Sequence, residues 1–255
     1  MLFDLFSLKG KNALITGSSR GLGFNIARGL AMAGAKIILN GRNQENLDRT
    51  VSELKNEGFE VFGSVFDVTE KKQINIQIAS IEQKIGPIDI LFNNAGIQRR
   101  KSLQELDEKD WQAVIDTNLT GAFLTSQQVV ASMIRRKKGK IINTCSLMSE
   151  LGRESVGAYS ASKGGLKMLT KNMATEWAKY NIQVNGIGPG YFATEMTRPL
   201  REDQEFDHWL KKRTPANRWG NPEELIGTAV FLASSASDFV NGQIIYVDGG
   251  VLAAI

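Results

Sequence analysis

Short apolar runs alternate with longer amphipathic stretches along the whole chain. The short runs are rich in β-branched residues and predict strands at 12–16, 36–40, 61–66, 88–92, 140–144, 182–186 and 243–247. Between them, apolar residues recur with the period of a helix and predict helices at 22–33, 44–57, 70–84, 108–135, 159–179 and 222–233. The pattern therefore predicts strands and helices in regular alternation.

The predicted strands are apolar at nearly every position, which is typical of strands that are covered on both faces. Right-handed helical crossovers between successive strands then give a parallel sheet with helices on both sides. No linker, low-complexity tract or internal repeat interrupts the pattern. We predict one α/β domain over residues 1–255, a Rossmann-type, doubly wound sheet of seven parallel strands.

The pattern weakens at about 191–218, where glycine, proline, threonine and charged residues surround a short helical stretch near 204–212. A long segment of this kind after a strand end is more often functional than structural filler. We interpret it as a lid over a substrate. A rigid surface excursion and an oligomer contact are alternatives that the sequence leaves open.

The charge distribution is typical of a mixed, solvated surface. Lys and Arg number 31 against 27 Asp and Glu, which gives a net charge of +4, and both signs are spread along the chain. The densest basic cluster, at 135–138, directly precedes a predicted strand, where cations suit the end of a helix. This interpretation is favoured over nucleic-acid binding.

Cysteine and histidine are nearly absent. Cys145 is the only cysteine, so the chain forms no internal disulfide and no thiolate site from two cysteines. His208 is the only histidine, so no catalytic metal centre is expected. No apolar stretch approaches the ~20 residues of a membrane span, and residues 1–8 lack the basic region of a secretory signal. We expect a cytoplasmic protein without a membrane partner.

A glycine-rich sequence, T-G-S-S-R-G-L-G at 16–23, connects the first predicted strand to the first predicted helix. Gly17 allows a sharp turn, Gly21 lets the backbone approach a pyrophosphate, and Gly23 lets the helix pack close to the sheet. The helix N-terminus offers free N–H groups to the anion. The motif predicts an NAD(P) site, although a glycine-rich helix entry without a ligand would read similarly. The expected contacts here are Gly17, Ser19, Arg20, Gly21, Leu22 and Gly23.

The end of the second strand bears on the choice of dinucleotide. An NAD-selective site carries an Asp or Glu about twenty residues beyond the loop, whereas residues 39–42 here read L-N-G-R. Arg42, and with it Arg20, could hold a 2′-phosphate through charge-assisted hydrogen bonds. NADP(H) is therefore expected ahead of NAD(H), which stays possible, and Arg42 could also simply begin an exposed loop.

Two more strand ends face the same edge of the predicted sheet. Asp67 and Val68 close the third strand, and Asn94, Ala95 and Gly96 follow the fourth. Asp67 would accept a hydrogen bond from the adenine amino group, while Ala95 and Gly96 leave room for a ribose and the nicotinamide. The sequence N-N-A-G is also an ordinary turn, but its position favours a cofactor contact.

A tyrosine and a lysine four residues apart carry the candidate chemistry. Tyr159 and Lys163 share one face of a predicted helix. To act as an acid and base near neutral pH, a phenol needs its pKa lowered by roughly three units from ~10. Lys163 and an oxidised nicotinamide each supply positive charge that does so. Ser146, at the end of the fifth strand, can stabilise charge on the same substrate oxygen, and Asn118 could bind backbone and order a water that relays protons to Lys163.

Each of these four residues alone could be structural. Together, downstream of a dinucleotide loop, they predict an oxidoreductase that interconverts an alcohol and a ketone. A non-catalytic dinucleotide-sensing protein is the alternative from another class, and the intact set argues against it.

The chain resembles the short-chain dehydrogenase/reductase family over its whole length. The resemblance rests on motifs in family order and spacing: T-G-x-x-x-G-x-G at 16–23, N-N-A-G at 93–96, Asn118, Ser146, Y-x-x-x-K at 159–163, and Pro189-Gly190 followed by Thr194. It implies the catalytic set Asn118, Ser146, Tyr159 and Lys163. It further implies that Lys163 binds the nicotinamide ribose, that Pro189, Gly190 and Thr194 contact the carboxamide, and that residues 243–255 pack against another subunit of a homotetramer.

Within the family, the stretches at 94–100, 145–153, 190–197, 213–220 and 238–242 resemble members that act on a small, polar sugar acid. Such a substrate needs a fixed cation for its carboxylate and several hydrogen-bond partners for its hydroxyls. The candidate substrate residues are Ser146, Glu150, Arg99, Arg100, Arg153, Tyr191 and His208, the arginines for the carboxylate. Each could also be a solvated surface residue, and another carbonyl, such as a 3-oxoacyl thioester or another sugar or polyol, is the alternative substrate.

Overall fold

Seven strands form one parallel sheet in the computed structural model, which describes residues 3–255, so Met1 and Leu2 of the opening segment lie outside the described residues. The strands are β1 (Asn12–Ile15), β2 (Lys36–Gly41), β3 (Val61–Val65), β4 (Ile90–Asn93), β5 (Gly139–Thr144), β6 (Ile182–Pro189) and β7 (Ile244–Val247). Their order is β3-β2-β1-β4-β5-β6-β7, with every neighbouring pair parallel. The predicted doubly wound sheet is confirmed.

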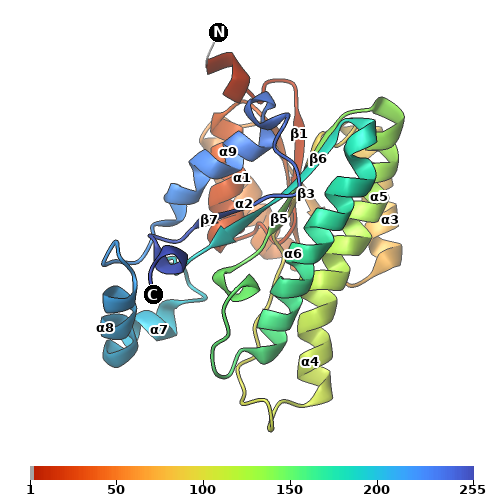
Figure 1. Ribbon diagram of the computed structural model, residues 1–255. Helices are drawn as coiled ribbons and strands as arrows, with labels where there is room; N and C mark the ends of the chain where they lie inside the picture. The colour runs from red at the N-terminus through yellow and green to blue at the C-terminus, as the bar shows by residue number, and fades with distance from the viewer. Residues whose placement is uncertain (1–2) are drawn as a thin grey trace.

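Helices cover both faces of this sheet (Figure 1). One side carries α1 (Gly21–Met32), α2 (Gln44–Asn56) and α9 (Ile226–Ala233), and the other carries α3 (Lys71–Lys84), α4 (Glu108–Ile115), α5 (Gly121–Arg136) and α6 (Gly157–Trp177). Two short helices, α7 (Arg198–Glu202) and α8 (Gln204–Arg213), lie beyond the sheet near the C-terminus. Among residues 3–255, every helix is too short or too polar to cross a membrane.

The apolar strands bury both of their faces, as their composition predicts. In β1, Ala13 and Ile15 join the core beneath α1, α2 and α9, while Leu14 between them joins the core beneath α3, α5 and α6. Successive side chains of a strand point to opposite sides, so a strand between two helical layers has no solvent-facing position for a polar residue. Several polar residues instead stand at strand ends, such as Asn40, Asn93 and Thr144, and Asn185 inside β6 is buried with Val240 O and Gln243 N as its hydrogen-bond partners.

The long helix predicted at 108–135 is interrupted. Residues Asp116–Thr120 form a π-helical turn between α4 and α5. Within that turn, the Asn118 side chain bonds the backbone of a neighbouring loop: its Oδ1 accepts from Ile97 N at 2.8 Å and its Nδ2 donates to Ile97 O at 3.0 Å. Such turns are frequent at functional sites, and periodicity alone does not predict them.

The segment at 191–218 contains two helices rather than the single predicted stretch. Pro199 stands in the first turn of α7, where its missing N–H is tolerated. Asp203 then adopts an extended conformation and caps α8 by accepting from Glu205 N and Phe206 N. The segment is therefore an ordered part of the fold, anchored by a backbone bridge between Phe192 and Gly220.

Candidate active site

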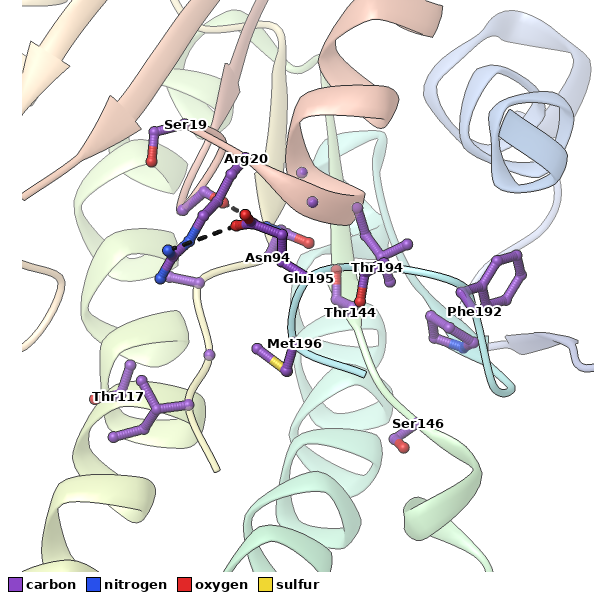
Figure 2. Close-up of a pocket in the computed structure, with 18 of the residues that line it drawn as sticks. Ser19, Arg20, Asn94, Thr117, Thr144, Ser146, Phe192, Thr194, Glu195 and Met196 are labelled. Atoms are coloured by element: carbon purple, nitrogen blue, oxygen red, sulfur yellow. Dashed lines mark hydrogen bonds and ion pairs between the residues drawn. The ribbon is translucent and has the colours of Figure 1, made fainter. Parts of the chain in front are cut away.

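A cavity of about 760 Å³ lies at the carboxyl edge of the sheet, where doubly wound folds bind their ligands. The glycine-rich loop, the ends of the inner strands and the start of the 191–218 segment line it (Figure 2). The structure brings every predicted cofactor contact to this cavity: Gly17, Ser19, Arg20, Gly21, Leu22, Gly23, Arg42, Asp67, Val68, Asn94, Ala95, Gly96, Tyr159, Lys163, Pro189, Gly190 and Thr194. Its size suits a small-molecule site.

The glycine-rich loop is held tightly against the end of β4. Gly17 has φ of +60°, and a Cβ at this residue would lie 2.7 Å from the Ala95 Cα. Asn94 Nδ2 donates to Thr16 O and Gly17 O, each at 3.0 Å. The helix that follows, α1, has no side-chain cap, so N–H groups of its first turn remain available to an anion. These features fit a dinucleotide pyrophosphate.

Asn40, at the end of β2, is a structural support of this loop that sequence reasoning missed. Its side chain is buried; Oδ1 accepts from Gly17 N at 3.1 Å, and Nδ2 donates to Ser64 O at 3.2 Å and Phe66 O at 3.0 Å. The sequence interpretation considered this region only for its missing carboxylate. An amide at the end of an apolar strand was the signal, because a buried polar side chain needs partners.

Two arginines stand at the rim of the cavity, each beside a carboxylate. Arg42 Nη1 lies 3.3 Å from Asp67 Oδ2, and Arg20 Nη1 lies 3.9 Å from Glu195 Oε2 (Figure 2). Burial alone would raise the pKa of Asp67, but hydrogen bonds from Thr69 and the Arg42 guanidinium hold the pKa below its usual value. Both guanidiniums are largely exposed, which leaves them free to turn towards a ligand phosphate.

Lys163 is buried, with 3% of its surface exposed. Its Nζ donates to Thr144 O at 2.5 Å and lies 5.7 Å from the Tyr159 ring centroid. Burial lowers the pKa of Lys163 to about 8, because the ammonium loses its hydration. The lysine and the tyrosine therefore face each other as predicted.

The pKa of Tyr159 is shifted against expectation. Burial raises it above its ordinary value, and a hydrogen bond with Ser146 offsets only part of that rise. In the protein without a cofactor, the prediction that Lys163 lowers the pKa of Tyr159 is therefore wrong. The burial that raises the pKa of the phenol also disfavours the charged form of the lysine. Of the two expected sources of positive charge, the oxidised nicotinamide remains.

Ser146 is oriented by the short helix η3 (Leu147–Ser149), which it caps. Its Oγ accepts from Met148 N at 3.1 Å, and Ser149 Oγ donates to Lys163 O at 2.9 Å, which ties the turn to α6. The Ser146 O–H is left to donate towards the cavity that the residue lines. The serine thus reaches the site of the phenol, as predicted.

Asn118 lies behind the cavity rather than in its lining. It is 1% exposed, and in addition to the bonds with Ile97 its Nδ2 donates to Ser162 Oγ at 3.1 Å. The backbone contact of the prediction is present, and the water relay to Lys163 stays a prediction.

One buried polar atom in the lining has no partner within residues 3–255, namely the Thr144 hydroxyl oxygen. Since buried polar groups are normally satisfied, an orphan that lines a cavity fits a ligand contact. Thr144 was not predicted, nor were Thr117, Phe192 and Met196, which also line the cavity. For Thr144 the signal was its position directly before Cys145 and Ser146.

Of the predicted substrate residues, only Ser146 lines the cavity. Arg99 pairs with Asp110 at 3.2 Å. Glu150 accepts from Lys167 Nζ at 2.5 Å and from Tyr246 OH at 2.6 Å, so its oxygens are engaged elsewhere. His208 is exposed on α8.

The remaining three substrate candidates gather beside the cavity. Arg153 Nη1 donates to Tyr191 OH at 3.2 Å. Partial burial and the like charge of Arg153 lower the pKa of Arg100, while Tyr191 acts in the opposite direction. Tyr191 also lies close enough to Tyr159 to raise its pKa. Two guanidiniums therefore gather around Tyr191, whose phenol lies near Tyr159.

The fold and this site together define a dinucleotide-dependent dehydrogenase or reductase, because an anion-binding loop and an acid/base pair meet at one cavity. The chain belongs to the short-chain dehydrogenase family, because the sequence model of that family matches residues 11–205. It is 56% identical over 252 residues to the 5-keto-D-gluconate 5-reductase of Escherichia coli strain K12, covering 99% of both chains.

Two further relatives extend the comparison. The chain is 55% identical to a 2-dehydro-3-deoxy-D-gluconate 5-dehydrogenase of Formosa agariphila, covering 100% of this chain and 97% of the relative. It superposes on the gluconate 5-dehydrogenase of Burkholderia cenocepacia J2315, solved in complex with NADP and tartrate, with a TM-score of 0.98, 51% identity and full coverage of both chains. The similarity thus spans the whole chain.

Proposed function

We propose that the protein is an NADP(H)-dependent oxidoreductase that interconverts D-gluconate and 5-dehydro-D-gluconate. The carrying observation is that Ser146, Tyr159 and Lys163 line the same cavity as the uncapped N-terminus of α1. Figure 2 shows Ser146 well separated from Ser19 and Arg20, which leaves room for an extended dinucleotide between them. The choice of substrate is supported by the similarity to the Escherichia coli and Burkholderia enzymes.

Tyr159 is the group that moves the substrate proton. The bound dinucleotide supplies the hydride for ketone reduction or accepts it in alcohol oxidation. In reduction, the Tyr159 O–H protonates the C5 oxygen while the Ser146 hydroxyl stabilises the charge on that oxygen. Burial disfavours the phenolate that results, so positive charge on the oxidised nicotinamide would be needed to stabilise it, and Lys163, 5.7 Å from the ring centroid, restores its proton. In reduction, a water ordered by Asn118 then supplies a proton to Lys163, and oxidation reverses all of these steps.

NADP(H) is the coenzyme that the rim charges favour. Arg42 and Arg20 both line the adenosine side of the cavity, and each can exchange its carboxylate partner for a 2′-phosphate. The Burkholderia relative was solved with NADP. In the same proposal, Asp67 faces the adenine, and Pro189, Gly190 and Thr194 face the nicotinamide carboxamide.

Replacing Arg42 by alanine is expected to raise the KM for NADPH about tenfold and to leave the kinetics with NADH nearly unchanged. A hydrogen bond to a charged group contributes about 1.5–3 kcal/mol, reduced here by solvent exposure. Initial rates at varied coenzyme concentration measure the effect. Arg49→Ala, which removes an exposed, paired arginine from α2, is the matched control, and an equal response of both variants would contradict the assignment.

The substrate carboxylate binds at Arg100 and Arg153, with Tyr191 between them and Tyr159. A carboxylate placed there neutralises two like charges whose proximity already lowers the pKa of Arg100. Gluconate carries its carboxylate at C1 and reacts at C5, so the cation that binds the carboxylate is a different group from the phenol that acts at the reacting carbon. The 191–218 segment is the lid over this substrate, and its Thr194, Glu195 and Met196 line the cavity.

We also infer a cytoplasmic homotetramer. The outermost strand β7 is only half-buried, and Ile255 at the end of the chain is fully exposed, which supports a contact of residues 243–255 with another subunit. Cys145 is buried and unpaired, which supports a reducing compartment.

Initial rates with a panel of substrates test the function. We expect the highest kcat/KM for 5-ketogluconate with NADPH, and for gluconate in the reverse direction. The Formosa relative makes 2-dehydro-3-deoxy-D-gluconate the second candidate, and a preference of more than about tenfold for it would replace the proposed substrate. Turnover of an acetoacetyl thioester alone would contradict both.

A further inference from the structure

Four aromatic side chains form what we call the lid aromatic cluster: Tyr191, Phe206 and Trp209 of the 191–218 segment, and Trp219 directly after it. Phe206 is at its centre, with ring centroids 5.9 Å from Tyr191, 5.2 Å from Trp209 and 6.4 Å from Trp219. Tyr191 meets both tryptophans edge to face. Aromatic pairs at these separations attract one another, so the lid aromatic cluster packs α8 against the end of β6.

One cation, the Arg153 guanidinium, contacts two members of this cluster. The Arg153 guanidinium lies 5.2 Å from the Phe206 ring centroid and 6.0 Å from that of Tyr191, and it also donates to Tyr191 OH. Within the described residues, no ion pair is formed by Arg153. The guanidinium is therefore positioned by aromatic faces and a phenol, and its charge is left for a ligand.

We propose that Phe206 is a positioning residue for substrate carboxylate binding, holding Arg153 beside Arg100 so that docking of α8 and capture of a sugar acid are one event. This inference rests on the proposed function. Two like charges repel one another and an unrestrained arginine side chain samples many rotamers, so a carboxylate would otherwise bear the cost of bringing them together. By holding the Arg153 guanidinium before the substrate binds, the Phe206 ring reduces this free-energy cost.

The position of Phe206 is itself set by local structure. The Asp203 cap places it in the first turn of α8. One residue later, Asp207 accepts from Trp219 Nε1 at 2.7 Å, which fixes the helix to the strand-like segment before Gly220. That segment bonds Tyr191 through Gly220 N, which donates to Tyr191 O at 2.9 Å. The position of the Phe206 ring against Arg153 is thus fixed by the Asp203 cap and by the hydrogen bond between Asp207 and Trp219.

The kinetic test compares three variants of the whole enzyme on two substrates. In Phe206→Leu, which keeps an apolar side chain but removes the ring, the KM for D-gluconate should rise about tenfold with kcat within twofold. Phe206→Tyr should restore the parent KM. Trp209→Leu is the matched control, because Trp209 belongs to the same helix and cluster but makes no contact with Arg153 among those described. With D-gluconamide, which replaces the carboxylate by a neutral amide, Phe206→Leu should change the KM no more than Trp209→Leu does.

A second measurement needs no substrate. Phenylglyoxal modifies accessible arginines, and mass spectrometry of the peptide containing Arg153 gives its rate of modification. We expect a severalfold faster reaction in Phe206→Leu and the parent rate in Trp209→Leu. Equal reaction of Arg153 in both variants, or an equal rise in KM for gluconate and gluconamide, would overturn the positioning role. Failure of the parent enzyme to oxidise gluconate would instead refute the proposed substrate, and the modification rates would still decide the role of Phe206.

Discussion

Tyr159→Phe is expected to lower kcat for gluconate oxidation and 5-ketogluconate reduction by roughly 10²–10⁴-fold, the usual contribution of a positioned acid or base. The variant loses only the phenolic oxygen, so the ring still packs against Lys163 and Ser146 still caps its turn. Binding of NADPH, measured by fluorescence titration, should stay within about twofold of the parent. A large fall in kcat with unchanged NADPH binding would identify Tyr159 as a proton-transfer group.

Tyr180→Phe is the control for that variant, since Tyr180 lies in the short helix η4 (Ala178–Tyr180) that follows α6 and is outside the cavity lining. It should retain the parent rate. A Tyr159→Phe enzyme that turned over at the parent rate would refute the mechanism, and one that no longer bound NADPH would show that the phenol has a different, structural role.

Lys163→Met should abolish most activity and also stabilise the protein near neutral pH. The pKa of Lys163 is about 8 in the folded chain against 10.5 as the unfolded reference, so the unfolded chain binds this proton more tightly. Below pH 8 the folded state therefore bears a cost of roughly 3 kcal/mol for the buried ammonium. The cost declines as the pH rises from 8 to 10.5 and is absent above that range. A methionine of similar length removes it.

Thermal unfolding at pH 7 and at pH 10 measures this effect. We expect a gain of several degrees for Lys163→Met at pH 7 and a much smaller gain at pH 10. Lys167→Met, one turn further along α6, is the control and should show no gain, because it breaks the ion pair with Glu150. An equal gain at both pH values would mean that burial of the charge is not the cause. The expected result would show that the buried ammonium of Lys163 lowers the free energy of unfolding of this protein near neutral pH.

The arginines illustrate why substrate residues were harder to predict than cofactor residues. Arg99 and Arg100 are adjacent in sequence, yet Arg99 pairs with Asp110 while Arg100 donates to Gln98 and lies near enough to Arg153 for its pKa to be lowered. Which neighbour a long, flexible side chain selects depends on segments that approach only in the folded chain. Glu150 is a similar case, because Tyr246 lies 96 residues away and takes one of its oxygens. No local pattern carries that information.

The glycine-rich loop and the strand-end residues were predictable for the opposite reason. Parallel strands present their carboxyl ends at one edge, so residues that follow different strands must converge there once the strand order is given. Gly17 and Ala95 meet in this way, and Thr144, two residues before Ser146, would have been found by applying the same rule to every strand end.

By itself, the sequence determined the alternation of strands and helices, the parallel sheet, and the convergence of the glycine-rich loop with Ser146, Tyr159 and Lys163, because these follow from periodicity and from spacing along single elements. The tertiary structure decided the π-helical turn at Asn118, the raised pKa of Tyr159 and the placing of Arg153 on Phe206. Each of these depends on burial or on contacts between distant segments, and both arise only when the layers pack.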